Sequence, residues 1–265
     1  MSRILHLSDL HFGAVDHRLV EPLLRLIAGL GADATVISGD LTQRARPGQF
    51  AAARAFIDRL PGPVLVVPGN HDMPLRNLPL RLARPLLRYC RTIPGPVEAA
   101  LALPDAVVQG VNSANPWAWK AGRLTAASAA RLDRAFAGAG EGTFRIAVMH
   151  HAPVPAADGT PADMAAPARV LSQLAAAGTD IVLSGHTHIP HAGFAEKAAG
   201  ILFLQVGTAI STRLRTDAND FALIELAPGR VTRRAFVARA GRAFAEAPPM
   251  QFLRGPGGWQ QLAPD

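Results

Sequence analysis

The chain has 265 residues, 49% of them hydrophobic and 18% charged, which excludes a disordered protein and is enough for one large domain. The net charge is +7, but no run of five basic residues and no aromatic-interleaved basic patch occurs, so the sequence disfavours nucleic acid as a partner. No apolar run approaches the ~20 residues that span a bilayer, Met1-Ser2-Arg3 opens no secretory signal, and the lone Cys90 excludes an internal disulfide, so we expect a cytoplasmic protein without a membrane span.

Short apolar runs, several rich in β-branched residues, predict strands along most of the chain. In chain order they are Ile4–Ser8, Thr35–Ser38, Val64–Val67, Ala106–Val111, Arg145–Met149, Asp180–Ser184, Ile201–Val206 and Phe221–Leu226. Amphipathic stretches with helical spacing lie between them, at Val20–Leu30, Gln49–Leu60, Ala126–Ala137 and Ala168–Ala176. The alternation of strand and helix over the first 75 residues indicates βαβ units and a largely parallel sheet.

From Phe144 onward the strands come with fewer helices between them, which suggests a second sheet packed on the first. We therefore expect an α/β fold, a four-layer αββα sandwich of two mixed sheets flanked by helices, over residues 1–241. The proline- and arginine-rich segment 73–104 is interpreted either as a surface insertion near the functional site or as a plain connection with a helix around Pro79–Tyr89. Residues 242–265, rich in Pro, Gly and Ala, are expected to form a C-terminal tail.

Five polar blocks follow predicted strands, and all are built from residue types that bind hard or borderline divalent cations. They are Asp9-Leu10-His11, Gly39-Asp40, Gly69-Asn70-His71-Asp72, His150-His151 and Gly185-His186-Thr187-His188. Ligands of open α/β sheets gather at the carboxyl ends of the strands, so neighbouring strands would bring these side chains to one edge. The sequence therefore predicts a metal centre there.

The blocks divide naturally into two ligand sets that share Asp40, which stands alone between two fuller motifs. One cation would take Asp9, His11, Asp40 and His188, and the other would take Asp40, Asn70, His150 and His186. The one-residue spacing in Asp9-x-His11 and His186-x-His188 predicts that, in extended backbone, both members point to the same side. Without a thiolate the set suits Mn²⁺, Fe²⁺/Fe³⁺ or Zn²⁺ alike.

All five blocks, in this order and without a missing ligand, resemble the pattern of the calcineurin-like metallophosphoesterases: D-x-H, G-D, G-N-H-D, H and G-H-x-H. The match spans residues 9–188. Within that superfamily, Leu5–Gly13 and Val182–His188 resemble the class III cyclic nucleotide phosphodiesterases. The resemblance implies the αββα sandwich, two divalent metal ions and a small phosphate-ester substrate.

Such a site predicts hydrolysis of a phosphoric ester (EC 3.1) by a metal-bridging hydroxide. We expect His71 to donate a hydrogen bond or proton to the leaving oxygen and Asp72 to hold its other ring nitrogen. His151 is a weaker candidate for substrate contact. Arg213 and Arg215 are interpreted either as bidentate phosphate ligands or as a solvated edge.

The leading hypothesis is a phosphodiesterase acting on a small phosphodiester such as a cyclic nucleotide. The alternatives are a phosphomonoesterase, a nucleotide or lipid pyrophosphatase, a DNA exonuclease, and a non-catalytic scaffold. Trp117 and Trp119 are interpreted either as stacking on a nucleobase or, with more weight, as packing into the core. The sequence does not give the oligomeric state and leaves a homodimer open.

Overall fold

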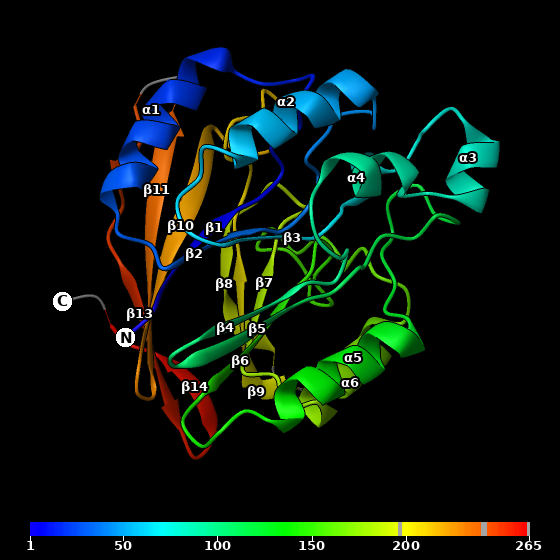
Figure 1. The fold of residues 1–265 in the computed structure, drawn as a ribbon. Coiled ribbons are helices and arrows are strands. Elements are labelled where there is room, and N and C mark those ends of the chain that lie inside the picture. The colour runs from blue at the N-terminus through cyan, green and yellow to red at the C-terminus, as the bar shows by residue number, and fades with distance from the viewer. Residues whose placement is uncertain (196–197, 240–242, 264–265) are drawn as a thin grey trace.

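The computed structural model describes residues 1–195, 198–239 and 243–263, and its framework is two β-sheets packed face to face (Figure 1). The first sheet has the order β14-β13-β11-β10-β1-β2-β3, with β12 pairing β11. Strands β1–β3 run parallel, and β10 pairs antiparallel with β1. The strands are β1 (Arg3–Leu7), β2 (Ala34–Ile37), β3 (Val64–Val66), β10 (Ala218–Ala227), β11 (Arg230–Arg239), β12 (Ala245–Glu246), β13 (Met250–Gly255) and β14 (Gly258–Gln261).

The second sheet has the order β4-β5-β6-β7-β9-β8. Its strands β5, β6, β7 and β9 are parallel to one another, and the edge strands β4 and β8 are antiparallel to their neighbours. The strands are β4 (Ala100–Leu103), β5 (Ala106–Gly110), β6 (Phe144–Val148), β7 (Ile181–Ser184), β8 (His191–Ala195) and β9 (Ala198–Gln205). Both sheets thus present several parallel strands whose carboxyl ends can share one edge.

Helices cover the outer faces of the two sheets, so the layers run helix, sheet, sheet, helix (Figure 1). Helices α1 (His17–Gly29) and α2 (Pro47–Ile57) lie over the first sheet, and α5 (Ala126–Ala137) and α6 (Pro167–Ala176) lie over the second. Helix α1 buries Leu19, Leu23, Leu24 and Ile27, which stand at positions i, i+4, i+5 and i+8 of one apolar stripe. No helix of the described residues is long and apolar enough to cross a membrane.

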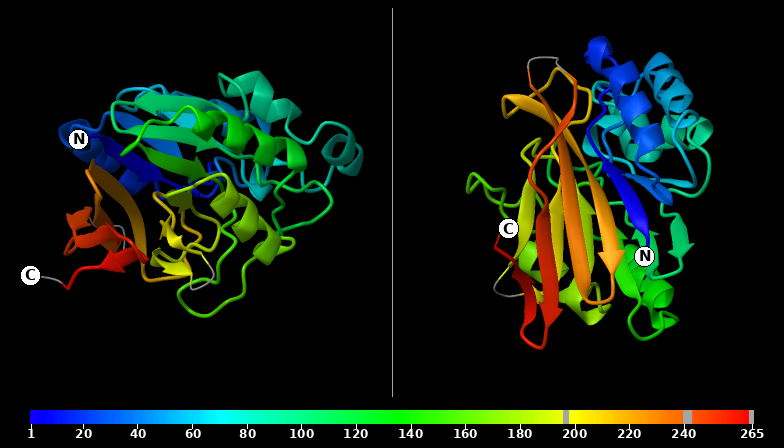
Figure 2. Two further views of the ribbon diagram at one scale, coloured as in Figure 1. Left: turned by 90° about the horizontal axis from the view of Figure 1, so that it is seen from below. Right: turned by 90° about the vertical axis from the view of Figure 1, so that its left-hand side faces the viewer.

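The two sheets meet in an apolar layer, here called the inter-sheet core. It includes Ile4 and Val36 of the first sheet, Phe144 and Ile146 of the second, and Trp259 of β14. Trp259 is 2% exposed, stacks on Phe144 with ring centroids 6.2 Å apart, and donates its indole N–H to the Asp180 carbonyl at 3.1 Å. The long strand β10, which lies beside β1, and its neighbour β11 (Figure 2) supply further apolar side chains to this layer.

The predicted fold class is confirmed, but the chain distributes its strands differently from the prediction. Strands β4 and β5, before Phe144, already belong to the second sheet, and the chain returns to the first sheet with β10. Strand β11 was missed because it carries four arginines. In the structure it buries Val231, Ala235, Phe236 and Ala238 together with Arg233, while Arg230 and Arg239 at its ends are exposed.

The expected C-terminal tail is wrong for residues 243–263. Strand β13 pairs with β11, and β14 pairs with β13, so this segment extends the first sheet. Phe252 and Trp259 are buried in the inter-sheet core. Two large aromatic side chains outweigh the Pro- and Gly-rich composition that suggested a tail.

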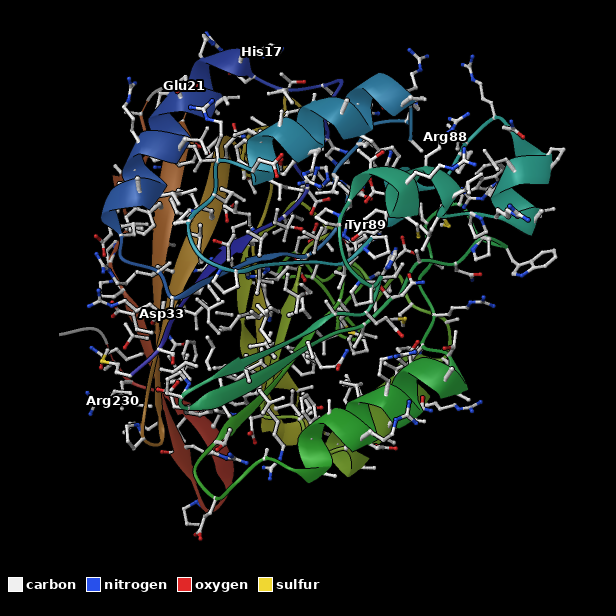
Figure 3. All side chains as sticks on the ribbon, viewed as in Figure 1. His17, Glu21, Asp33, Arg88, Tyr89 and Arg230 are labelled. Atoms are coloured by element: carbon white, nitrogen blue, oxygen red, sulfur yellow. The ribbon has the colours of Figure 1, made fainter. Side chains whose placement is uncertain are left out.

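The segment 73–104 has features of both a surface insertion and a helical connection. It forms α3 (Leu78–Ala83), α4 (Leu87–Thr92) and the edge strand β4, rather than one helix around Pro79–Tyr89. Tyr89 of α4 is buried, and its hydroxyl donates to the Val66 carbonyl at 3.0 Å (Figure 3). Arg88 donates to the Ala45 carbonyl at 2.8 Å, so the segment is anchored to the body of the domain. Arg84-Pro85 separates the two helices because proline disfavours a helical residue before it.

Candidate metal centre

The seven predicted ligands come from loops that follow parallel strands in both sheets. The first sheet contributes Asp9 and His11 after β1, Asp40 after β2, and Asn70 in the short 3₁₀ turn η1 (Asn70–Asp72) after β3. The second sheet contributes His150 after β6, and His186 and His188 after β7. The site therefore forms where the carboxyl ends of the two packed sheets meet.

The first ligand set converges on a small volume. The Nε2 atom of His188 lies 3.0 Å from Asp9 Oδ1 and 3.0 Å from His11 Nε2. His11 Nε2 lies 3.8 Å from Asp40 Oδ2. Two imidazole nitrogens and two carboxylate oxygens thus point at a common centre.

The second ligand set converges beside the first and shares Asp40 with it. His150 Nε2 lies 3.4 Å from Asp40 Oδ2, 3.2 Å from Asn70 Oδ1 and 3.3 Å from His186 Nδ1. The same oxygen of Asp40 therefore faces His11 of one set and His150 of the other. This is the arrangement that a bridging carboxylate requires.

The donor set fits two divalent cations. Aspartate, imidazole and amide oxygen suit borderline and hard cations, and the convergence of nitrogen lone pairs in a buried site is favourable only with a proton or a cation between them. Burial disfavours charge on Asp40, yet His150, His71 and His11 together outweigh it and hold the pKa of the Asp40 carboxyl below its usual range. Burial likewise opposes charge on His150, but Asp40 and Asp9 raise the pKa of His150 to about 9.

Hydrogen bonds of the ring nitrogens that face away from the cation site fix the orientation of the ligating histidines. His150 Nδ1 donates to the Ser38 carbonyl at 2.8 Å, and His188 Nδ1 donates to the Arg213 carbonyl at 2.5 Å. A carbonyl only accepts, so in both rings Nδ1 carries the proton and Nε2 presents a lone pair to the cation site. His186 is turned the other way, with Nε2 3.1 Å from Asp163 Oδ2 and Nδ1 facing the second ligand set.

The ligands converge through left-handed backbone rather than through the extended spacing that the sequence suggested. Asp9, His11, Asp40, His186 and His188 have φ values of +52°, +49°, +48°, +74° and +58°. Among the described non-glycine residues, only Ala45 and Ala166 share this conformation. Aspartate and histidine tolerate the left-handed region better than most residues, and such strain concentrates at functional sites.

Glycine beside the ligands permits the close approach of the loops. A Cβ atom on Gly39 would lie 2.6 Å from His150 Nδ1, and one on Gly69 would collide with the Asp40 carboxylate. Gly39 also has a φ of +97°, which side-chain-bearing residues rarely adopt. The glycines that precede Asp40 and Asn70 therefore allow the two sheets to bring their ligands into one site.

His71 lies beside the two ligand sets, at a distance of 5.0 Å between its ring centroid and that of His11. Its Nδ1 donates to the Gln43 carbonyl at 2.9 Å, and its Nε2 accepts from Arg213 Nη1 at 3.0 Å. Burial is the main reason that the pKa of His71 lies below its usual value. The ring is held neutral, with its Nε2 and the guanidinium of Arg213 facing the cavity.

The expected contact between Asp72 and His71 is wrong. The buried carboxylate of Asp72 accepts backbone N–H groups of Leu41, Thr42 and Gly69 at 3.1, 2.9 and 3.0 Å, so it ties two ligand-bearing loops together. Burial, followed by the nearby charge of Asp40, raises the pKa of Asp72 to about 7. The backbone carbonyl of Gln43 takes the place that the sequence assigned to Asp72.

A cavity of about 330 Å³, here called the main hollow, opens over the ligands. Arg213 and Arg215 both line it, whereas His151 does not. His151 is fully buried, shares a 2.8 Å hydrogen bond with Ser113 Oγ, and packs its ring behind His150 and His186, so the expected substrate contact through His151 is wrong. Further lining residues that no sequence signal indicated are Lys120, Thr160 and Asp163.

Comparison with known proteins supports the same assignment. The chain is 34% identical over 80 residues to glycerophosphodiester phosphodiesterase GpdQ of Enterobacter lignolyticus (strain SCF1), a stretch that covers 26% of this chain and 29% of the relative. The match thus spans less than a third of that relative's length.

Two solved structures show the same fold at low sequence identity. Purple acid phosphatase PPD1 from yellow lupin seeds matches with a TM-score of 0.68 and 11% identity, over 94% of this chain and 53% of that one. A dimetal phosphatase from Danio rerio matches with a TM-score of 0.65 and 13% identity, over 92% of this chain and 98% of that one.

The sequence model of one family, described as calcineurin-like phosphoesterase, matches residues 2–190 and so covers every ligand of both sets. With the two converging ligand sets on a double-sheet sandwich, this match establishes that the chain belongs to the calcineurin-like phosphoesterase family.

Proposed function

We propose that this protein is a phosphodiesterase (EC 3.1) that depends on two divalent metal ions and hydrolyses a small phosphodiester. The observation that carries the proposal is the position of Asp40 Oδ2, 3.8 Å from His11 Nε2 and 3.4 Å from His150 Nε2. One carboxylate oxygen that faces both ligand sets allows two cations to lie close together, which is the requirement for a metal-bridging nucleophile.

The two cations would be held by the ligand sets described above, with Asp9, His11, Asp40 and His188 around one and Asp40, Asn70, His150 and His186 around the other. When bound, such a pair activates water and polarises phosphoryl oxygens. Carboxylate, amide and imidazole donors without a thiolate leave Mn²⁺, Fe²⁺/Fe³⁺ and Zn²⁺ as candidate metals.

Side chains of this chain would complete the chemistry around the phosphoryl group. Lys120, Arg213 and Arg215 line the main hollow and would bind the anionic oxygens. We assign Arg213 Nη1 and His71 Nε2, 3.0 Å apart, to the leaving oxygen. Arg213 would neutralise its developing charge. His71 would take up a proton from water at Nε2 and donate that proton to the leaving oxygen.

Two features favour a diester over other phosphoric esters. The relative GpdQ carries the name of a glycerophosphodiester phosphodiesterase. In addition, the main hollow is lined by residues beyond the ligands, among them Thr160, Asp163, His71 and Arg213, which leaves room beside the phosphoryl group for an ester arm.

A phosphomonoesterase is the second candidate, because three cationic side chains line the main hollow and would suit a dianionic substrate. Turnover of bis-p-nitrophenyl phosphate and of p-nitrophenyl phosphate by the Mn²⁺-loaded protein separates the two functions. We expect the diester to have the higher kcat/KM. Turnover of the monoester alone would refute the phosphodiesterase assignment, and turnover of neither by protein with a full complement of metal would favour a non-catalytic scaffold.

A further inference from the structure

A second cavity of about 210 Å³, here called the side hollow, adjoins the main hollow. The two cavities share four lining residues, Asn70, His71, Lys120 and Arg213. These include one predicted metal ligand and the pair assigned to the leaving oxygen, so the reacting centre lies between the two hollows. Only the side hollow is lined by Gln43, Arg44, Met73, Leu75 and Trp119.

The two hollows differ in chemistry. Outside the shared residues, the main hollow is mostly polar, with Thr160, Asp163 and Arg215 among its lining groups. The side hollow instead has three apolar lining residues, Met73, Leu75 and Trp119. Arg44 supplies a cation at the same cavity, with its Nη1 3.4 Å from His71 Nδ1. A tryptophan beside the cationic side chains of Arg44, Lys120 and Arg213 suits a flat, partly polar group.

Trp119 does not pack into the core, as the sequence had suggested with more weight. It is 56% exposed, and Trp117 is 72% exposed. Tryptophan is enriched at binding surfaces because it combines an apolar ring with a polar N–H group. The stacking interpretation is therefore the one that the position of Trp119 favours.

The loop that carries Trp119 is fixed although its indole is exposed. Arg81 of α3, only 2% exposed, donates to the carbonyls of Pro116 at 2.9 Å and of Ala118, and its guanidinium lies 5.0 Å from the Trp119 ring centroid. The Trp119 carbonyl accepts from Asn70 Nδ2 at 3.3 Å. Trp119 is thus held in a fixed position relative to the predicted metal ligand Asn70. Binding of a substrate would therefore cost little side-chain entropy at Trp119.

We propose that the side hollow holds one ester arm of the substrate, and that Trp119 selects a flat aromatic arm, such as an aryl group or a nucleobase, over a small aliphatic one. This inference rests on the proposed function, because a diester has two arms, one for each hollow. Trp119 acts as a specificity-determining residue and takes no part in the chemical step.

Titration calorimetry of the Mn²⁺-loaded protein with phenylphosphonate and methylphosphonate tests the inference without requiring turnover. The two probes share a phosphonate and differ only in the arm. We expect phenylphosphonate to bind about tenfold more tightly to the unaltered protein, in line with the worth of aromatic stacking. Trp119→Ala should reduce the preference to within about twofold and leave methylphosphonate binding unchanged, which shows that fold and metals are retained.

Two further variants serve as controls. Trp119→Phe should keep most of the preference, and Trp117→Ala, which lies outside both hollows in the same loop, should keep all of it. Equal binding of the two probes by the unaltered protein, or a preference that survives in Trp119→Ala, would overturn the inference. If either result is obtained while the diester is hydrolysed, the inference fails and the proposed function stands. If the preference depends on Trp119 but the diester is not hydrolysed, the proposed function is refuted instead.

Discussion

The metal centre and the inter-sheet core make opposite use of the same double-sheet framework. In the inter-sheet core, extended strands bury Ile4, Val36, Phe144 and Trp259 in apolar contact. At the metal centre the chain buries Asp9, His11, Asp40 and His150 almost completely, and three of these four have left-handed backbone.

The difference shows how the fold tolerates its site. Buried ionisable groups and left-handed non-glycine residues each cost about 1 kcal/mol or more. Buried apolar area returns about 25 cal/mol per Å² and is concentrated in the inter-sheet core. Changes at the metal centre should therefore abolish function while the fold persists. Changes in the inter-sheet core should destabilise the fold while the activity of each folded molecule persists.

The strongest test on the metal side is Asp40→Asn. This change removes the bridging negative charge and should lower kcat/KM for bis-p-nitrophenyl phosphate on the order of 10³-fold, the upper range for loss of one electrostatic element of a site. The protein should stay folded in circular dichroism and retain less metal in elemental analysis. Asp133→Asn, on the exposed face of α5, serves as the matched control. Retention of two metals and full activity by Asp40→Asn would refute the bridge.

The strongest test on the core side is Trp259→Ala. Loss of a buried tryptophan should reduce the free energy of unfolding by about 3–5 kcal/mol, because a cavity forms between the sheets. Urea titration measures this loss, and Trp117→Ala, with its exposed indole, should change stability by less than about 0.5 kcal/mol. Activity per folded molecule should stay the same. A small loss of stability for Trp259→Ala would mean that residues 243–263 contribute little to the stability of the fold, as expected for a tail.

His71→Ala sharpens the comparison within the metal centre, because we assign His71 to the leaving oxygen although it belongs to neither ligand set. For a diester with an alkyl leaving group we expect a loss in kcat of about 10²-fold, the lower range for general acid catalysis. For bis-p-nitrophenyl phosphate the loss should be much smaller, because p-nitrophenolate leaves without a proton. His17→Ala, on the exposed start of α1 (Figure 3), is the control. Equal losses for both leaving groups would contradict the role assigned to His71.

The last prediction is a pH dependence of metal affinity, which is the smallest effect when it is counted per pH unit. The pKa of His150 is raised from 6.5 to about 9 by Asp40 and Asp9, against the effect of burial. A cation must displace that proton, so affinity should rise with pH by up to about tenfold per unit until pH 9. In the metal-free protein, protonated His150 stabilises the fold. This stabilisation is complete below pH 6.5 and is lost as the pH rises to 9.

Calorimetric Mn²⁺ titrations between pH 6 and 9, with urea unfolding of the metal-free protein over the same range, measure both effects. A metal affinity that does not change with pH would contradict the claim that the cation displaces a proton from His150.

The identity of the site was open to prediction from sequence because its chemistry is carried by residue type and order. Asp9, His11, Asp40, Asn70, His150, His186 and His188 each follow an apolar run, and the carboxyl ends of parallel strands meet at one edge. Most strands and the layered fold were predicted for the same reason, since hydrophobic periodicity is a local property.

Tertiary structure alone decided the contacts between distant loops. Asp72 bonds backbone amides instead of His71, His151 packs behind the ligands, and Lys120 and Asp163 reach the main hollow from loops with no sequence signal. The composition of residues 243–263 resembled that of a tail, but Trp259 found a place against Phe144 of the other sheet. A sequence pattern states what each residue can bind or bury; the partner it takes depends on which segments packing brings within a few ångströms, and that is a property of the whole fold.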